Sequence, residues 1–257
     1  MQISTDRELW IRRFHPLPDA PVRLLCLPHA GGSAPFFRPL SSTLAPSVEV
    51  LAVQYPGRQD RRNEPCVESV EQLAELVFHA LADDRDRPLA LFGHSLGASV
   101  AFEVAALLER RAEVEPAVLF VSGRSAPSRA DSTSVHLRGD DELVAEMQRL
   151  GGTDARILAD PEMREFVLPA LRGDLRAAET YRPERTDVLA CPISALIGDA
   201  DPRARVEDVR AWAEHTGGEF DLRIFPGGHF YLAERSAEVI RHLADRLERV
   251  AAGSAGG

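Results

Sequence analysis

The chain has 257 residues, of which 44% are hydrophobic and 27% are charged, values that are ordinary for a globular protein. Its formal net charge of −10 argues against a nucleic acid as partner, because no dense stripe of basic side chains is present to replace phosphate counterions. Three widely separated cysteines predict neither a disulfide framework nor a metal cluster. The length fits one large α/β domain or two small ones.

The two ends of the chain show no targeting pattern. The first residues are polar and charged, without the apolar region or cleavage pattern of a secretory signal. No apolar run reaches the length of a membrane span, so we expect a cytoplasmic protein that does not bind membranes. The last residues, 253–257, consist of Gly, Ser and Ala and are expected to form a flexible tail.

Strands and helices are predicted to alternate along most of the chain. Short apolar runs predict buried strands, and apolar residues at helical spacing predict the helices between them. Ser69 and Gln72 match a capping box, and Asp160 followed by Pro161 is typical of a helix start. The predicted strands cover 22–27, 48–53, 88–92, 117–122, 193–197 and 220–225, and helices are predicted to begin near 36, 69, 98, 140, 161, 206 and 236.

This alternation predicts an α/β protein with a mostly parallel central sheet, helices on both faces, and a single domain over residues 1–257. The alternation breaks at about 124–190, where two helices are predicted between successive sheet strands. We expect this insertion to be a helical lid. The alternative is an extra packing layer that has no functional motion.

The pentapeptide Gly93-His94-Ser95-Leu96-Gly97 stands between a predicted strand and a predicted helix. A G-x-S-x-G pattern in that context is typical of a nucleophile elbow, in which a sharp turn exposes the serine hydroxyl. The glycines keep side chains out of the places where strand and helix crowd the turn. A chance match in a loop is the alternative, and the flanking elements argue against it. The pattern therefore predicts Ser95 as a nucleophile.

A serine hydroxyl is a weak nucleophile at neutral pH and needs a base, usually a histidine held by a carboxylate. In the α/β-hydrolase fold the three residues follow in the order Ser, Asp or Glu, His, each just after a strand. This chain has that order, so we predict the α/β-hydrolase fold. His229, in a Gly-rich turn after the last strand, is the predicted base. Asp201, which precedes Pro202, is the preferred acid, and Asp199 in the same turn is the alternative.

An oxyanion hole needs two backbone N–H donors aimed at the tetrahedral intermediate. Leu96 is the first predicted donor, and Ala30, in the glycine-rich loop at 28–33, is the second. His94 is expected to point away from the nucleophile, and His29 is expected to shape the loop. The chain has no dinucleotide-binding glycine pattern, no Walker lysine and no zinc-spaced ligands, so we expect neither cofactor nor metal.

Four motifs occur together: Leu27-Pro28-His29-Ala30-Gly31-Gly32-Ser33, Gln54-Tyr55-Pro56-Gly57-Arg58, Gly93-His94-Ser95-Leu96-Gly97 and Phe225-Pro226-Gly227-Gly228-His229-Phe230. Together they resemble the motifs of type II thioesterases, free-standing α/β hydrolases that accompany modular polyketide synthases and non-ribosomal peptide synthetases. The resemblance covers about residues 10–250. It is more specific than the serine motif alone, because the Pro-Gly-Arg loop accompanies the other three.

The resemblance implies hydrolysis of aberrant or stalled acyl groups from the phosphopantetheine arm of acyl or peptidyl carrier proteins. Ser95 would attack the thioester and His229 would take its proton. Asp201 matches the family's acid position, and Ala30 and Leu96 match its oxyanion positions. The insertion matches the family's helical lid. The arm belongs to the substrate, so the enzyme itself would need no cofactor.

Other functions remain open. One is a medium-chain fatty acyl thioesterase or a general carboxylesterase with the same triad, and another is a catalytically silent hydrolase used as a binding module. We expect a monomer. Carrier proteins are generally acidic, so a net charge of −10 opposes electrostatic steering toward them. Arginines near the expected mouth of the site would offset this repulsion: Arg58, Arg61 and Arg62, or Arg124 and Arg129.

Overall fold

The computed structural model describes residues 3–4, 6–129, 133–151, 160–183 and 188–254. Its strands form a seven-stranded sheet in the order β1-β3-β2-β4-β5-β6-β7. β1 pairs antiparallel with β3, and the other pairings are parallel, which confirms the expected mostly parallel sheet. The strands are β1 (Ile11–Arg12), β2 (Val22–Leu27), β3 (Val48–Val53), β4 (Leu89–His94), β5 (Leu119–Ser122), β6 (Ile193–Gly198) and β7 (Phe220–Phe225).

The central strands are covered on both faces. Every residue of β2, β3, β4, β5 and β6 is buried, as expected for parallel strands that are joined by crossover helices. β7 lies at one edge and keeps exposed residues. Because the parallel strands point the same way, the loops that follow them meet at one edge of the sheet. The predicted serine, acid, base and glycine-rich loop all lie in such loops.

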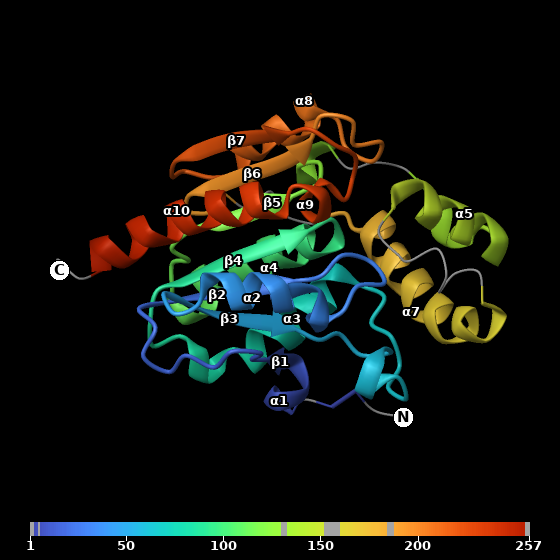
Figure 1. Ribbon diagram of the computed structural model, residues 1–257, viewed down its shortest axis with the longest axis horizontal. Coiled ribbons are helices and arrows are strands. Elements are labelled where there is room, and N and C mark those ends of the chain that lie inside the picture. The colour runs from blue at the N-terminus through green and yellow to red at the C-terminus, as the bar shows by residue number, and fades with distance from the viewer. Residues whose placement is uncertain (1–2, 5, 130–132, 152–159, 184–187, 255–257) are drawn as a thin grey trace.

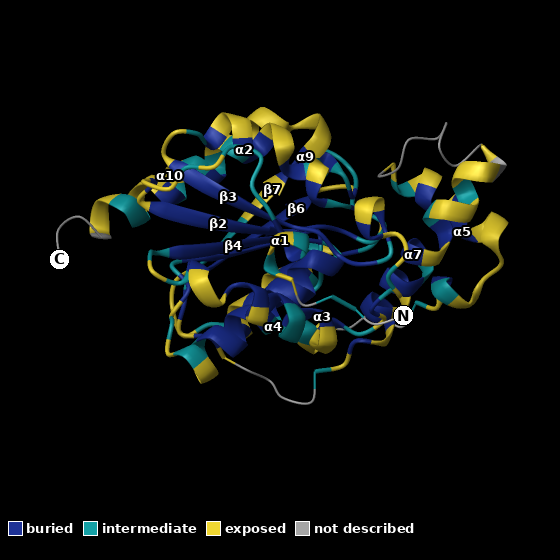
Figure 2. Ribbon diagram, turned by 90° about the horizontal axis from the view of Figure 1, so that it is seen from below, coloured by how far each residue is buried: buried dark blue, intermediate teal, exposed yellow. Residues whose placement is uncertain are grey.

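Helices cover both faces of the sheet. In the described chain they are α1 (Arg7–Trp10), α2 (Arg38–Leu44), α3 (Val70–Ala80), α4 (Leu96–Ala112), α5 (Asp140–Leu150), α7 (Pro161–Thr180), α8 (Val206–Arg210), α9 (Tyr231–Glu234) and α10 (Ser236–Ser254). Figures 1 and 2 show α2, α9 and α10 over one face, and α3 and α4 over the other. None of the described helices is both long and apolar enough to cross a membrane.

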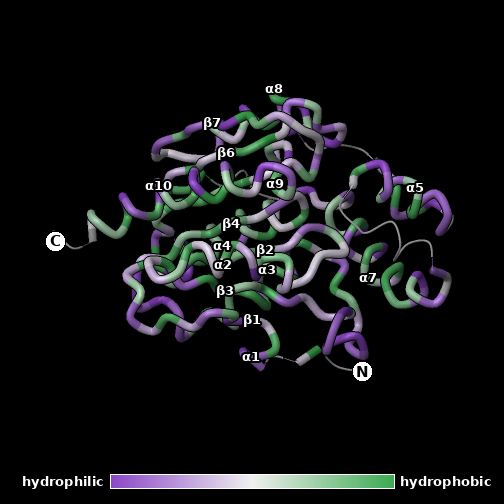
Figure 3. The backbone as a smooth tube through the Cα atoms, viewed as in Figure 1, coloured by the Kyte–Doolittle hydropathy of each residue, from purple (hydrophilic) through white to green (hydrophobic). Residues whose placement is uncertain are grey.

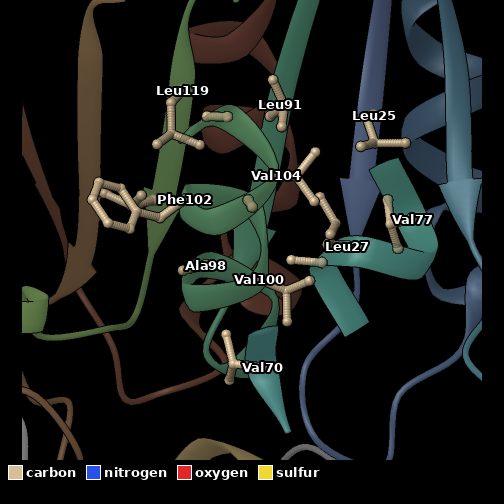
Figure 4. Packing of buried hydrophobic residues seen from close by; sticks show 14 of the residues in the cluster. Leu25, Leu27, Val70, Val77, Leu91, Ala98, Val100, Phe102, Val104 and Leu119 are labelled. Atoms are coloured by element: carbon tan, nitrogen blue, oxygen red, sulfur yellow. The ribbon is translucent and has the colours of Figure 1, made fainter. Parts of the chain in front are cut away.

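Helix α4 is buried along most of its length, because its sequence is apolar on nearly every side. Figure 4 shows Val100 and Val104 of this helix near Leu25, Leu27 and Leu91 of the sheet, within one buried cluster. The alternate residues of the same strands face the other way and pack with α2 and α10. Hydrophobic segments accordingly gather in the strands, and hydrophilic ones gather on the outer helices and loops (Figure 3).

Two helix starts carry a predicted N-cap hydrogen bond, and at Ser69 the described contacts include only the serine half of the capping box. Ser69 accepts a hydrogen bond from the Gln72 N–H at 3.3 Å at the start of α3. Asp160 accepts one from the Glu162 N–H at 2.9 Å, so that α7 begins at Pro161 as predicted. These caps satisfy N–H groups that have no partner within the first turn of a helix.

The two ends of the chain hold structure that the sequence did not predict. Residues 1–20, which we interpret from the sequence as a polar lead-in, contain α1 and β1, and Trp10 at their junction is 0% exposed. Trp10 is buried because the guanidinium of Arg61 lies over its ring, 4.3 Å from the centroid, and because β1 adds an edge strand beside β3. At the other end, α10 extends to Ser254, into the predicted flexible tail. Positions 255–257 lie outside the described residues.

Helices α5 and α7 lie at one end of the molecule, beyond the carboxyl ends of the parallel strands (Figure 1). They come between β5 and β6, where the sequence predicts an insertion. Their apolar side chains, Leu171 and Leu175 among them, form a separate small cluster, and Ala30 of the glycine-rich loop packs against it. The insertion is therefore in contact with a predicted part of the active site. Short parts of it lie outside the described residues.

Candidate active site

Ser95 is the single residue between the end of β4 and the start of α4. Its backbone has φ 56° and ψ −115°, a conformation that residues other than glycine rarely adopt. Its N–H donates to the Ser122 carbonyl of β5 at 2.8 Å. Such strain persists where the surrounding structure enforces it, and it is typical of a serine on a sharp strand-to-helix turn.

Gly93 and Gly97 permit this turn because other backbone passes very close to both. A Cβ atom at Gly93 would lie 2.1 Å from the Gly97 carbonyl oxygen, and one at Gly97 would lie 2.1 Å from the Leu27 carbonyl oxygen. Neither position admits a side chain. The elbow is therefore packed directly against the end of β2, where the glycine-rich loop begins at Pro28.

His229 and Asp201 meet where β7 and β6 end. The Asp201 carboxylate oxygens lie 3.0 and 2.9 Å from His229 Nδ1, and the two side chains are 0% and 4% exposed, respectively. Asp201 also accepts a hydrogen bond from the Arg203 N–H at 2.8 Å, which fixes the carboxylate. A buried carboxylate on Nδ1 orients an imidazole and leaves its Nε2 to act on another group.

Asp199, the alternative acid, has a different neighbour. Its Oδ1 accepts from the Gly227 N–H at 2.9 Å, and the residue is exposed. The next residue, Ala200, donates its N–H to the Gly227 carbonyl at 3.0 Å. Asp199 therefore ties the turn after β6 to the turn that carries His229, and Asp201 is the carboxylate that contacts the imidazole.

His94 precedes the serine in sequence but belongs to the buried sheet. Its Nδ1 lies 2.9 Å from Ser122 Oγ, which lies 2.6 Å from the Tyr231 hydroxyl. Burial, with smaller contributions from His229 and His29, lowers the pKa of His94 well below its ordinary value. The His94 ring packs against the His229 ring with centroids 5.0 Å apart. A neutral His94 thus packs against the proposed base and has a structural role.

His29 packs edge to face against Phe36 and Phe230, with both pairs of ring centroids 4.8 Å apart. Burial, with smaller contributions from His229 and Arg58, lowers the pKa of His29 to about 3. A histidine that stays neutral and lies among aromatic rings acts as a packing residue. It supports the glycine-rich loop from within, as the sequence suggests.

Ala30 and Leu96 are the predicted oxyanion-hole residues. Leu96 is the first residue of α4, at the positive end of the helix dipole. Ala30 lines the same cavity as Ser95 and His229. Among the hydrogen bonds between described residues, none uses the N–H of Ala30 or of Leu96. Both donors are therefore free to meet a developing oxyanion, and their catalytic role remains a prediction.

The cavity between the strand ends and the insertion has a volume of about 40 Å³. Ser95, His229 and Ala30 line it from the sheet side, and Leu175 and Ala178 of α7 line it from the other side. Within the described residues, no cluster of His, Cys, Asp and Glu could hold a metal ion.

Charged side chains link the insertion to the loop that carries Asp201, and the sequence did not predict these links. Arg203, two residues after Asp201, lies 3.2 Å from Glu146 of α5 and 3.5 Å from Glu179 of α7. Glu179 is 2% exposed and also accepts two backbone N–H bonds from residues 135–136. An acidic residue within the apolar stripe of a helix was the available signal. Its partners could not be identified, because they come from distant segments.

Two of the arginines expected at a carrier docking site are buried. Arg58 is 7% exposed and Arg61 is 1% exposed. Arg61 donates to the Glu64 carboxylate at 2.7 Å and to the Gln54 carbonyl at 2.8 Å. A buried guanidinium with such partners cannot meet another protein, so the expectation is wrong for Arg58 and Arg61. Arg62 is exposed, and its role in docking remains a prediction.

Known proteins share this sequence and this fold. The family model described as "Thioesterase domain" matches residues 22–247. The chain is 54% identical to thioesterase PikA5 of Streptomyces venezuelae over 246 residues, which cover 95% of this chain and 88% of that protein.

Solved structures of thioesterases are also similar to this chain. The type II thioesterase BorB from the borrelidin biosynthetic cluster matches with a TM-score of 0.87 and 48% identity, over 96% of this chain and 100% of that one. YbtT, a type II thioesterase from the yersiniabactin NRPS/PKS biosynthetic pathway, matches with a TM-score of 0.84 and 29% identity, over 94% and 99% of the two chains. The strained serine between strand and helix, the sequence relatives and these structures lead to one conclusion: the chain belongs to the thioesterase family, has the α/β-hydrolase fold, and is a type II thioesterase of polyketide or non-ribosomal peptide biosynthesis.

Proposed function

We propose that the protein removes aberrant or stalled acyl groups from the phosphopantetheine arm of acyl or peptidyl carrier proteins, through a Ser95–His229–Asp201 triad. The observation that carries this proposal is that Ser95 and His229 line one cavity while Asp201 holds His229 Nδ1 from behind. Relatives described as type II thioesterases of biosynthetic clusters support the carrier-bound substrate.

In the acylation step, Ser95 Oγ attacks the thioester carbonyl carbon and His229 Nε2 takes the hydroxyl proton. Asp201 keeps the imidazole oriented and stabilises the imidazolium that forms. The carbonyl oxygen becomes an oxyanion, which accepts hydrogen bonds from the N–H groups of Ala30 and Leu96. The carbon–sulfur bond then breaks, and the proton on His229 passes to the departing sulfur of the pantetheine arm.

In the deacylation step, water attacks the acyl ester on Ser95. His229 takes a proton from the water and returns it to Ser95 Oγ as the ester bond breaks, so that a free carboxylic acid leaves. In this proposal the reaction needs only the substrate, water, the three side chains and the two backbone N–H groups. We further propose that α5 and α7 act as a lid over the acyl group and that the protein works as a monomer.

One acyl group presented in three ways tests the proposal: on a carrier protein, on a small thiol, and as an oxygen ester. Wild-type protein is run beside Ser95→Ala. We expect clear preference for the carrier-bound thioester and loss of turnover in the variant. Equal or faster hydrolysis of the oxygen ester would indicate a general esterase. No turnover of any substrate by folded wild-type protein would indicate a binding module.

A further inference from the structure

A buried ion pair joins α7 to the Pro-Gly-Arg loop. Arg58 Nη1 lies 2.5 Å from Asp174 Oδ2, and Arg58 Nη2 lies 2.7 Å from Asp174 Oδ1. The two side chains are 7% and 1% exposed. Arg58 Nε also donates to the Pro56 carbonyl at 3.2 Å. The planar guanidinium and the carboxylate therefore form a rigid, paired unit between segments 116 residues apart.

The same pair holds the glycine-rich loop. Asp174 Oδ2 accepts a hydrogen bond from the Gly31 N–H at 2.8 Å, and the guanidinium donates to the Gly32 carbonyl at 3.0 Å. Gly31 has φ +73°, and a Cβ atom there would lie 3.1 Å from Leu171 Cδ1 of α7. Both residues that follow Ala30 are thus tied to α7 or to its arginine partner.

This tether bears on the oxyanion hole. Ala30 directly precedes the two tethered glycines, and its N–H is the proposed donor of the loop. Glycines allow many backbone conformations, so a loop that contains two of them does not fix the direction of that N–H by itself. Hydrogen bonds to the next two residues restrict the loop before substrate binds. Donors that are already in place stabilise a transition state without reorganisation during the reaction.

Stability alone does not explain the pair. Buried ion pairs often contribute no more to stability than apolar residues of similar size, because removing both charges from water is costly. A second ion pair on the same helix offers a contrast. Arg176 Nη1 lies 2.5 Å from Glu68 Oε2 and ties α7 to the segment before α3, but these side chains are 58% and 47% exposed. Among the described contacts, that pair does not reach the glycine-rich loop.

We propose that Asp174 and Arg58 are positioning residues: α7 supplies a carboxylate that, together with Arg58, holds the glycine-rich loop so that the Ala30 N–H meets the oxyanion. The inference rests on the proposed function, since it assigns a partner to the oxyanion hole of that reaction. It makes α7 part of the catalytic apparatus as well as a cover over the substrate.

Steady-state kinetics of the full-length protein on an acyl-pantetheine thioester provide the first test. In Asp174→Asn the Ala30 N–H is displaced but still present. We therefore expect kcat to fall about 10- to 100-fold, which is no more than the loss typical of deleting an oxyanion-hole donor. KM should change little, because the interaction belongs to the transition state. Arg176→Gln breaks the exposed pair on the same helix and should leave both constants near the wild-type values.

A transition-state analogue separates positioning from general structural damage. A trifluoromethyl ketone analogue of the substrate forms a tetrahedral adduct with Ser95 whose oxygen occupies the oxyanion hole. Its inhibition constant should rise in Asp174→Asn by the same factor by which kcat/KM falls. The affinity of a thioether analogue, which has no oxyanion, should not change.

The proposal is overturned if folded Asp174→Asn matches Arg176→Gln in kcat and in affinity for the ketone. If circular dichroism shows that Asp174→Asn does not fold, the same tests apply to Arg58→Lys, which keeps a cation but lacks the planar fork that reaches Asp174 and Gly32 together. Failure of both variants to fold would also overturn it, since the pair would then serve folding. Failure of the proposed function would appear elsewhere, as absence of thioester turnover in the wild type.

Discussion

The two walls of the active-site cavity are held in different ways. The wall built from the strand ends carries Ser95 and His229, and backbone packing fixes it, as at Gly97, where no side chain fits. The wall built from α5 and α7 is attached to the rest of the molecule by charged side chains, of which the Arg58–Asp174 pair is buried most deeply. One wall thus depends on close backbone contact, and the other on long-range ion pairs together with the apolar contacts that α7 makes with the core.

Apart from the proposed Arg58–Asp174 tether, this difference separates the residues proposed to carry out the chemistry from the helices that cover them. Changes at the strand ends should alter the rate for every acyl group, because the proposed nucleophile and base are held there. Changes on the apolar side of α7 should alter which acyl groups are accepted, because those side chains line the cavity.

The largest effect is expected for Ser95→Ala on the strand-end wall. Loss of the nucleophile should lower kcat by at least about 10⁴-fold, since the oxyanion hole and substrate binding alone give little catalysis. Release of free thiol from an acyl-pantetheine thioester measures it. Ser99→Ala, which removes a second hydroxyl from the same cavity, is the control and should cost far less. Comparable losses of kcat in the two variants would contradict the proposal that Ser95 is the nucleophile.

Asp201→Asn should lower kcat by up to about 10⁴-fold, because an amide favours the wrong tautomer of the catalytic histidine. Asp199→Asn keeps an oxygen that can accept the Gly227 N–H and should have a small effect. The same thiol-release assay compares the two. A greater loss in Asp199→Asn would reverse the choice of acid.

On the wall built from α5 and α7, Leu175→Ala should change which acyl chains are hydrolysed more than it changes the rate of the chemical step. Leu175 is 3% exposed and lines the cavity, so its truncation should lower the free energy of unfolding by about 2–5 kcal/mol. It should also raise kcat/KM for longer acyl chains relative to short ones. Val144→Ala, in the same apolar cluster but away from the cavity lining, should lower stability without shifting that ratio. An unchanged ratio in Leu175→Ala would separate α7 from acyl selection.

The smallest effect is expected from His29, whose folded-state pKa of about 3 lies below its value in the unfolded chain. The unfolded state therefore binds more protons between about pH 6.5 and pH 3, and the stabilising contribution is present above that range and lost as pH falls through it. His29→Gln should reduce the slope of the unfolding free energy against pH by up to about 1.4 kcal/mol per pH unit. Urea unfolding at pH 7 and pH 5 measures this, and an identical pH dependence in the variant would contradict it.

The strand-end wall was largely predictable because its signals are local. β2 and β3 have the predicted bounds, Asp160 caps α7, and the pentapeptide around Ser95 marks the turn between strand and helix. The order of Ser95, Asp201 and His229 places each in a loop after a strand, and parallel strands bring such loops to one edge. The sequence alone left two carboxylates open, and the structure puts Asp201 beside the imidazole.

The cover was less predictable because its attachments are distant in sequence. The Pro-Gly-Arg motif singles out Arg58 and suggests an arginine near the mouth of the site, yet its partner Asp174 lies 116 residues further along the chain. Trp10 was missed for the same reason, since its burial depends on Arg61 and on pairing with β3. Patterns within a segment show which side of a helix is buried, but they do not identify the charge that it meets.

The proposed mechanism passes the acyl group through an ester on Ser95, which mass spectrometry of protein trapped during turnover can detect. Wild-type protein is mixed with an acyl-carrier thioester, quenched in acid within the first turnover, and digested. The peptide that contains Ser95 should carry the added mass of the acyl group, and Ser95→Ala should carry none and release no thiol above background. An acyl group on another residue, or wild-type rates of thiol release from Ser95→Ala, would contradict an ester intermediate on Ser95.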